Sequence, residues 1–287
     1  MAYKKSKRTK KPANGASPVR AEVPNNSNGV FFGWRPDLPD HRDLPYAAMR
    51  LSLEKPVTLP AQVDLRPHSP PIYDQGDLGS CTGNAIAGAF HFDRRKQNLP
   101  DFIPSRLFIY YNERRMEGSI STDAGAYIRD GIKSIAKEGV CKETQWPYDI
   151  AKFAIKPPKP CYADATKYRS LNYFRLNNAN LDELKTCLAA GFPFVFGFVV
   201  YPSFFQGDAD HGVVPMPGNE SIKGGHAVVA VGYNDSNQKF IIRNSWGTAK
   251  GDLGYYYMPY QYLTNTSLSD DFWTIRTVTT AALRPAN

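Results

Sequence analysis

Helical and strand patterns occupy different parts of this chain, and their order is the strongest constraint on its fold. Up to about Tyr168, apolar residues recur mostly at helical spacing, with patterns that begin near Cys81, Ser105 and Ala126. Beyond Tyr168 the chain is typical of strands and turns, apart from the helix-like stretch LDELKTCLAAG. The main strand candidates are FVFGFVV, HAVVAVGY and KFIIRN. A helical half followed by a β half predicts an α+β fold with a cleft between the halves.

Cys81 lies at the expected start of the first helix. In the stretch YDQGDLGSCTGNAIAGAF, small residues surround this cysteine, and the apolar residues after it recur on one helical face. Unpaired backbone N–H groups and the positive end of the helix dipole favour a thiolate at such a position. The sequence therefore predicts a reactive cysteine, provided that a base reaches it.

His226 and Asn244 are the candidates for that base and for the group that orients it. His226 opens the strand HAVVAVGY and Asn244 ends the next strand, so antiparallel pairing would bring them together. The imidazole then takes the thiol proton, while the amide fixes the ring plane. Gln75, six residues before Cys81, would stabilise an oxyanion together with the Cys81 N–H. Each residue alone also fits a structural role, and only their combination favours catalysis.

The net charge of +8 comes mainly from the beginning of the chain. Met1–Arg20 holds seven basic residues and no acidic one, and it is rich in Pro, Ser, Asn and Gly. Such a segment does not bury enough apolar surface to fold, so residues 1–28 are expected to form a disordered basic arm. Docking of this arm on a polyanion is the alternative interpretation. Since the rest of the chain is nearly neutral, no nucleic acid is required as a partner.

Targeting and metal-binding signals are missing from the sequence. No apolar stretch follows the basic start, so no signal peptide is expected, which favours a cytoplasmic protein or one exported without such a signal. The longest apolar run, Gly191–Tyr201, has 11 residues, whereas a membrane helix needs roughly 20, so no membrane insertion is expected. The four cysteines form no CxxC spacing, and neither a metal nor another cofactor is expected. A Cys141–Cys161 disulfide and two reduced thiols are equally compatible with the sequence.

Three motifs in this order resemble the papain-like cysteine peptidases. They are DQGDLGSC, GGHAVVAVGY and RNSWGTAKGDLGYYY, preceded by LPAQVDLR, which is similar to the mature start of those enzymes. The phrases GWRPDLPDHRD, SCTGNAIA and WPYD are similar to the bacterial subgroup typified by xylellain. The resemblance implies a papain-like fold of two subdomains, a helical left half and a β-barrel-like right half, with the active-site cleft between them.

The resemblance also implies roles for particular residues. The oxyanion donor, nucleophile, base and orienter are Gln75, Cys81, His226 and Asn244. Residues that support the site are Gly79, Ser80 and Trp246. A His-paired cysteine of this kind has a thiol pKa of about 3–4, which is the value expected for Cys81. The implied partners are peptide or protein substrates and the epoxide and cystatin-like inhibitors of the family.

Three positions depart from the family pattern, and the substrate subsites follow it only loosely. Leu78 replaces a common disulfide cysteine, Thr82 replaces an aromatic residue, and Lys250 replaces a second tryptophan. The candidate substrate-binding residues are Asp123, Gly125, Tyr127, Gly225 and Asp270. Asp270 is expected near the floor of the second non-primed subsite, which would then accept arginine as well as bulky apolar residues at P2.

A proline-rich, pro-segment-like region at residues 29–57 precedes the peptidase domain, residues 58–287. Within this domain the helical half spans about 69–167, and the β half spans about 168–287 with 58–68. A long helix is prevented by Pro36, Pro39, Pro45 and Pro56. An apolar patch would be exposed on a free segment by Phe31, Phe32 and Trp34. We expect about residues 28–46 to lie on the body and to obstruct Cys81, since a tethered segment needs only weak contacts. The alternative is a strap on the back of the β half.

The sequence therefore predicts a cysteine endopeptidase. It would hydrolyse peptide bonds through a Cys81 thioester acyl-enzyme, restrained by its short N-terminal segment. One alternative is a Cys-His acyl transferase of the transglutaminase or peptide ligase type, which product analysis with an added amine would identify. The other is a catalytically silent papain-like binding module, in which an epoxide would not label Cys81.

Overall fold

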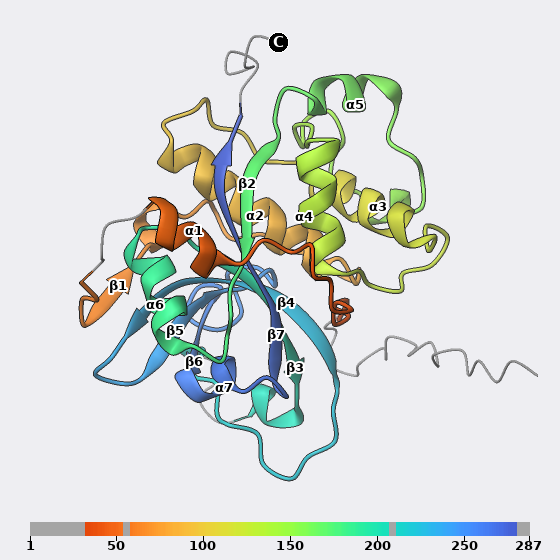
Figure 1. Ribbon diagram of the computed structural model, residues 1–287. Helices are drawn as coiled ribbons and strands as arrows, with labels where there is room; N and C mark the ends of the chain where they lie inside the picture. Colours follow the sequence, from red (N-terminus) through yellow and green to blue (C-terminus); the bar gives the residue numbers. More distant parts are fainter. Residues whose placement is uncertain (1–31, 54–57, 207–210, 280–287) are drawn as a thin grey trace, which may run out of the picture.

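The computed structural model describes residues 32–53, 58–206 and 211–279. The expected basic arm and Phe31 lie outside the described residues. A group of helices lies beside an antiparallel sheet, and the first described residues cross between the two (Figure 1). This is the α+β architecture that the order of the sequence patterns predicts.

Four helices form the helical half. They are α2 (Cys81–Lys96), α3 (Arg106–Glu117), α4 (Ile128–Lys137) and α5 (Lys159–Ala165). Helix α2 is central and is buried from Cys81 to Arg94, because α3 and α4 pack against it on one side and the sheet packs on the other. The Ser105 hydroxyl caps α3 by accepting the Phe108 N–H. Helix α4 ends at Lys137, two residues before the glycine at which the sequence pattern ends.

Seven antiparallel strands form the β half. In chain order they are β1 (Gln62–Asp64), β2 (Ser170–Arg175), β3 (Phe194–Val200), β4 (Gly224–Asn234), β5 (Lys239–Arg243), β6 (Tyr255–Pro259) and β7 (Ser269–Val278). Their spatial order is β2-β7-β3-β4-β5-β6, with β1 added to β4. The two end strands do not pair with each other among the described residues, so the sheet is open, whereas the resemblance implies a barrel-like half.

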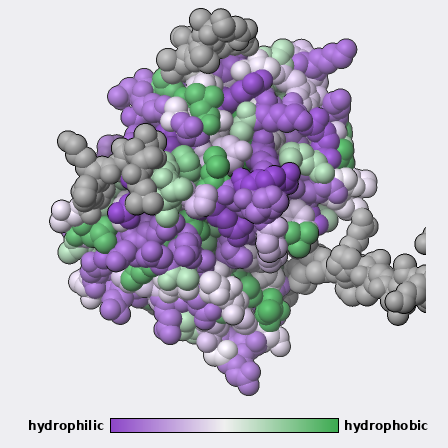
Figure 2. Space-filling model, in the orientation of Figure 1, coloured by the Kyte–Doolittle hydropathy of each residue, from purple (hydrophilic) through white to green (hydrophobic). Residues whose placement is uncertain are grey.

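The remaining helices are short and connect or cover these two halves. They are α1 (Tyr46–Leu53), α6 (Leu181–Ala189), α7 (Tyr260–Thr264) and the 3-10 turns Arg66–His68, Ile150–Lys152 and Pro202–Phe205. None of the helices in the described ranges is long and apolar enough to cross a membrane. The face shown in Figure 2 is mostly hydrophilic, with small scattered hydrophobic areas.

The register of the sheet brings the predicted base and its orienter to one place. Strand β4 pairs with β3 through Phe198 and His226, and with β5 through Val229 and Arg243. The chain leaves β5 at Arg243, so Asn244 follows directly beside the beginning of β4. Helix α2 packs against β4 from the helical half. Residues far apart in the sequence therefore meet at the junction of the halves.

Residues 32–45 run along this junction, with a turn at residues 40–43. Trp34 forms a parallel bridge with Ala126, which shortly precedes α4, and Pro45 forms one with Arg175 at the end of β2. The segment thus contacts both halves, and Figure 1 shows it crossing in front of the sheet before α1.

A buried carboxyl group lies under the beginning of α2. Glu113 on α3 is fully buried, and its Oε2 accepts a hydrogen bond from the Thr82 hydroxyl at 2.7 Å. Its other oxygen has no hydrogen-bond partner among the described residues. Burial is the main cause that raises the pKa of Glu113 to about 8. Thr82, which replaces the aromatic residue of the family pattern, therefore partners an acid that keeps its proton at neutral pH.

We expect Glu113→Gln to be more stable than the wild-type chain at alkaline pH. The pKa of Glu113 is about 8 in the folded state and 4.5 as its ordinary value, so the folded chain holds this proton more tightly. The resulting stabilisation is fully present below pH 4.5 and is lost as the pH rises through about 8. The advantage of the variant should grow by up to about 1.4 kcal/mol per pH unit within this window. Urea unfolding at several pH values measures this, with Glu138→Gln as the control. Identical pH dependence in Glu113→Gln and wild type would contradict the prediction.

Candidate active site

Cys81 is the first residue of α2 and is fully buried. The backbone amides of Ala227, the residue after His226, and of Gly33 in the N-terminal segment lie close enough to the sulfur to lower its pKa in part. The contact with Ala227 places the thiol beside the beginning of β4. The thiol of the helical half and the imidazole of the β half therefore meet at the junction of the two halves.

His226 is oriented by an amide and covered by an indole ring. Its Nε2 lies 2.7 Å from Asn244 Oδ1, an oxygen that only accepts, so Nε2 carries the proton. The rings of Trp246 and His226 stack at 4.5 Å with an interplanar angle of 24°. Within the described ranges the other ring nitrogen, Nδ1, has no hydrogen-bond partner. The imidazole is thus held in one tautomer whose Nδ1 is able to accept a proton.

The Gln75 side chain is fixed in one orientation at the same junction. Its Oε1 accepts a hydrogen bond from the Ser245 hydroxyl at 2.7 Å, and its Nε2 donates to Leu78 O at 2.9 Å. The Gln75 backbone N–H also donates to Ser245 O at 2.9 Å. The amide flip is therefore determined by its neighbours, and Nε2 faces the turn that leads to Cys81.

Burial shifts the pKa values of the thiol and of the imidazole toward their uncharged forms. Loss of solvation raises the pKa of Cys81 to about 12, although three backbone N–H groups lower it in part. The same loss lowers the pKa of His226 to about 4, against the opposing effect of Asn244. In this closed structure the shift thus runs opposite to the thiol pKa of about 3–4 that the resemblance implies. Helix position favours a thiolate, but desolvation outweighs it.

Backbone groups of the N-terminal segment cover the thiol. Gly33 N–H and Trp34 N–H both donate to Gly225 O, at 3.1 and 2.9 Å. On the opposite side, Ala126 N–H donates to Gly33 O at 2.7 Å, and Arg35 N–H donates to Ala126 O at 3.1 Å. Phe32 is fully buried and lies edge-on to the His226 ring. Residues 32–35 therefore pair with both walls of the cleft.

The Trp34 side chain fills a slot beside the catalytic candidates. Its indole packs against Gly197 of β3 and Gly225 of β4, where a Cβ atom would collide with the ring. Its Nε1 donates to Asp271 Oδ2 at 2.9 Å. Asp270, the sequence candidate for the floor of the second non-primed subsite, is half-exposed, and both it and Asp271 pair with Arg175, at 2.9 and 3.1 Å. The buried acid that the slot contains is Asp271.

The other predicted residues divide between the cleft wall and its support. Gly225 and Gly125 contact the backbone of the N-terminal segment from its two sides. Gly125 has a φ of +69°, a conformation that favours glycine. Asp123 supports the turn before Cys81, because its carboxylate accepts hydrogen bonds from the Gly79 N–H at 2.9 Å and from the Tyr110 hydroxyl. Tyr127 carries the Arg35 guanidinium over its ring at 4.3 Å.

Sequence reasoning missed several residues of this site, namely Ala126, Tyr148, Ser245 and Asp271. Strand alternation gives no signal for Asp271, because its backbone has a φ of +60° and the register of β7 with β3 shifts at this point. No signal existed for Ala126 either, which acts through its backbone. Ser245 and Tyr148 become visible only through their hydrogen bonds.

All four cysteines are free thiols. Cys141 and Cys161 are both buried and form no disulfide, and the Cys161 thiol donates to Gln145 O at 3.7 Å. No group of three potential metal-ligating side chains occurs among the residues that the structure describes.

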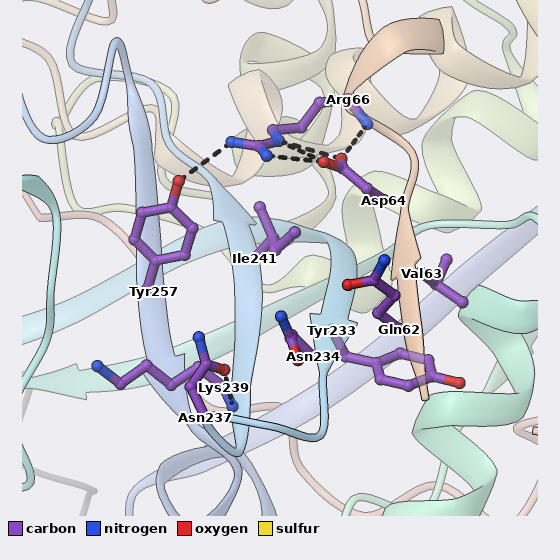
Figure 3. Close-up of a pocket in the computed structure, with 10 residues that line it drawn as sticks. All are labelled: Gln62, Val63, Asp64, Arg66, Tyr233, Asn234, Asn237, Lys239, Ile241 and Tyr257. Atoms are coloured by element: carbon purple, nitrogen blue, oxygen red, sulfur yellow. Dashed lines mark hydrogen bonds and ion pairs between the residues drawn. The ribbon is translucent and has the colours of Figure 1, made fainter. Parts of the chain in front are cut away.

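A separate hollow of about 310 Å³ lies among β1, β4, β5 and β6 (Figure 3). The Asp64–Arg66 ion pair lies at one side of it, and Arg66 also donates to the Tyr257 hydroxyl. The hollow is lined by Gln62, Val63, Asp64, Arg66, Tyr233, Asn234, Asn237, Lys239, Ile241 and Tyr257. None of the catalytic candidates is among these residues.

Comparison with known proteins agrees with this geometry. The model of the papain family of cysteine proteases matches residues 59–271. An uncharacterized peptidase C1-like protein of Acanthamoeba polyphaga mimivirus is 44% identical over 271 residues, which cover 86% of this chain and 87% of that protein. The structure of xylellain, a cysteine protease from Xylella fastidiosa, is 45% identical, covers 92% of this chain and 99% of its own, and superposes with a TM-score of 0.79. Procathepsin B of Trypanosoma congolense, at 19% identity and a TM-score of 0.67 over 87% of this chain and 86% of its own, shares the fold.

In the full chain at neutral pH, Cys81 should be a neutral thiol. Its pKa of about 12 and the pKa of about 4 for His226 leave both groups uncharged between these values. The ultraviolet difference spectrum between the wild type and Cys81→Ser measures the thiolate directly. We expect no thiolate absorption at neutral pH, with Cys187→Ser as the matched buried-thiol control. A thiolate band specific to Cys81 at neutral pH would show that the sulfur is not desolvated.

Proposed function

This chain belongs to the papain family of cysteine proteases, and from that premise we propose that it is an endopeptidase restrained by its own N-terminal segment. The observation that carries the proposal is the meeting of Cys81, at the N-terminus of α2, with the oriented His226–Asn244 pair, whose Nε2 and Oδ1 are 2.7 Å apart. The proposed domain limits are residues 29–57 for the segment and 58–287 for the peptidase.

In the proposed reaction, the Cys81 thiolate attacks the carbonyl carbon of a peptide substrate. The oxygen becomes an oxyanion that accepts hydrogen bonds from the Cys81 N–H and the Gln75 Nε2. Protonated His226 gives its proton to the leaving amine as the C–N bond breaks and the thioester forms. Water, with His226 as base, then hydrolyses the thioester and releases the acid. Asn244 holds the imidazole plane through both steps.

Three features support restraint by the segment. The backbone amide of Gly33 lies beside the sulfur, and its N–H donates to Gly225 O at 3.1 Å, so the segment occupies space that a substrate would need. A Cβ atom on Gly33 would collide with Gly79 O, so only glycine fits between the segment and the nucleophile turn. The uncharged Cys81–His226 pair is also the less reactive form. We infer that displacement of residues 32–35 both opens the cleft and allows the thiolate–imidazolium pair to form.

Gly33→Ala should activate the full-length chain. Forcing a methyl group into a filled site costs about 1–3 kcal/mol, so the equilibrium shifts toward the displaced segment, and kcat/KM for a peptide reporter should rise roughly tenfold. Gly218→Ala is the matched control, because no atom lies within 4 Å of the added Cβ atom there.

The same assay separates the competing functions. A folded Gly33→Ala chain with wild-type activity would favour the strap alternative. Products joined to an added amine, instead of hydrolysed acid, would favour the acyl transferase. Absence of turnover by both chains would favour the binding module.

We further propose that the slot occupied by Trp34 accepts the P2 side chain. Its glycine walls leave room for bulky apolar residues, and the Asp271 carboxylate offers an acceptor for arginine. In the Gly33→Ala chain, Asp271→Asn should lower the ratio of kcat/KM for Arg-Arg over Phe-Arg reporters about tenfold, the scale of a charge-assisted hydrogen bond. Asp270→Asn is the matched control and should leave the ratio unchanged. A lower ratio in Asp270→Asn together with an unchanged ratio in Asp271→Asn would instead assign the arginine contact to Asp270.

A further inference from the structure

The motif WPYD places a tyrosine hydroxyl at the turn before the nucleophile. Tyr148 belongs to the loop between α4 and α5, and its hydroxyl donates to the backbone oxygen of Gln75 at 2.9 Å. The Ser80 Oγ lies 2.5 Å from the same hydroxyl. Because the single Tyr148 proton is used toward Gln75, Ser80 must be the donor in the second bond. One hydroxyl therefore joins Gln75 to Ser80.

These two residues bracket the short turn that holds both proposed oxyanion donors. Gln75 carries the side-chain donor, and Ser80 immediately precedes Cys81, whose N–H is the backbone donor. Asn84 holds Ser80 from the helix side, since its Nδ2 donates to Ser80 O and to Ser80 Oγ at 3.0 Å each. The Tyr148 hydroxyl contacts both ends of the turn, at Gln75 O and at Ser80 Oγ. The separation of the two donors thus depends on this hydroxyl.

Tyr148 is itself held rigidly. The Arg106 guanidinium lies over its ring at 4.0 Å and forms two hydrogen bonds with Glu143, at 2.9 and 2.5 Å. Arg106 also donates to Asp74 O at 3.0 Å, next to Gln75. Burial raises the pKa of Tyr148 to about 12, so its hydroxyl remains a donor at neutral pH. The bridge is consequently anchored at both of its ends and at its ring.

We propose that Tyr148 is a positioning residue of the oxyanion hole, because its hydroxyl sets the distance between the Gln75 amide and the Cys81 N–H. This inference rests on the proposed function, in which those two groups bind the oxyanion. Tyr148 does not touch the substrate or the sulfur in this role. It acts in the transition state of acylation, where negative charge develops on the carbonyl oxygen, and it contributes little to ground-state binding.

Tyr148→Phe in the full-length chain removes the hydroxyl and keeps the ring under Arg106. Loss of one direct oxyanion donor typically costs about 10²–10³ in kcat, so an indirect loss of alignment should lower kcat about tenfold, with KM unchanged. Alkylation of Cys81 by iodoacetamide forms no oxyanion, and its rate should stay at the wild-type value. Since both rates are measured on the same chain, their ratio is insensitive to the fraction of folded or open molecules.

Two further variants complete the test. Tyr162→Phe removes a hydroxyl that donates to Asn112 at 3.0 Å away from the turn, and both rates should match wild type. Ser80→Ala removes the other hydroxyl of the same hydrogen-bonded bridge. The double variant Ser80→Ala/Tyr148→Phe should therefore lower kcat no more than the single variant with the larger loss.

The outcomes are distinct. Unchanged kcat in Tyr148→Phe, an equal fall in hydrolysis and alkylation, or additive losses in the double variant would each overturn the role of Tyr148. If alkylation of wild-type Cys81 left peptidase activity intact, the proposed function itself would fail.

Discussion

The close approach of one backbone to another at Gly33 is the constraint on which the closed structure depends. Only a residue without a side chain fits against Gly79 O there, and this fit brings the Gly33 backbone beside the Cys81 sulfur. Water is excluded as a result, and desolvation then decides the charge state of the thiol and of His226. The same backbone course delivers Trp34 to its slot. In the restraint that we propose, burial couples inhibition to chemistry, and the catalytic candidates themselves do not change.

Ionic contacts hold the segment to both halves of the molecule. Asp43 pairs with Arg129 of α4 at 2.7 Å and with Arg175 of β2 at 3.2 Å. Asp37 N–H donates to Asp271 of β7 at 2.8 Å, and burial together with the nearby Asp271 raises the pKa of the Asp37 carboxyl to about 8. The Trp34 Nε1 also donates to Asp271, so this one buried acid accepts hydrogen bonds from two residues of the segment. The slot that we assign to the P2 side chain is thereby also an anchor of the segment.

The catalytic candidates come from two halves, and each half needs its own support. On the β side, Asn244 and the stacked Trp246 ring fix His226. On the helical side, Asn84 and the Tyr148 bridge fix the turn from Gln75 to Ser80. Ser245 links the two sides, because its hydroxyl donates to Gln75 Oε1 while its residue follows Asn244. The site is therefore aligned by hydrogen bonds that cross the junction between the halves.

The sequence alone determined the class of fold, the positions of the main helices and strands, and the catalytic candidates, because periodicity and local motifs are encoded over short stretches. It also indicated that the aromatic residues before Pro36 had to pack on the body. Only the tertiary structure decided which of Asp270 and Asp271 faces the slot, that Tyr148 bridges Gln75 and Ser80, and that burial raises the pKa of Cys81. These properties arise from burial and from contacts between residues distant in sequence. Desolvation in particular depends on what covers a group, which no local pattern records.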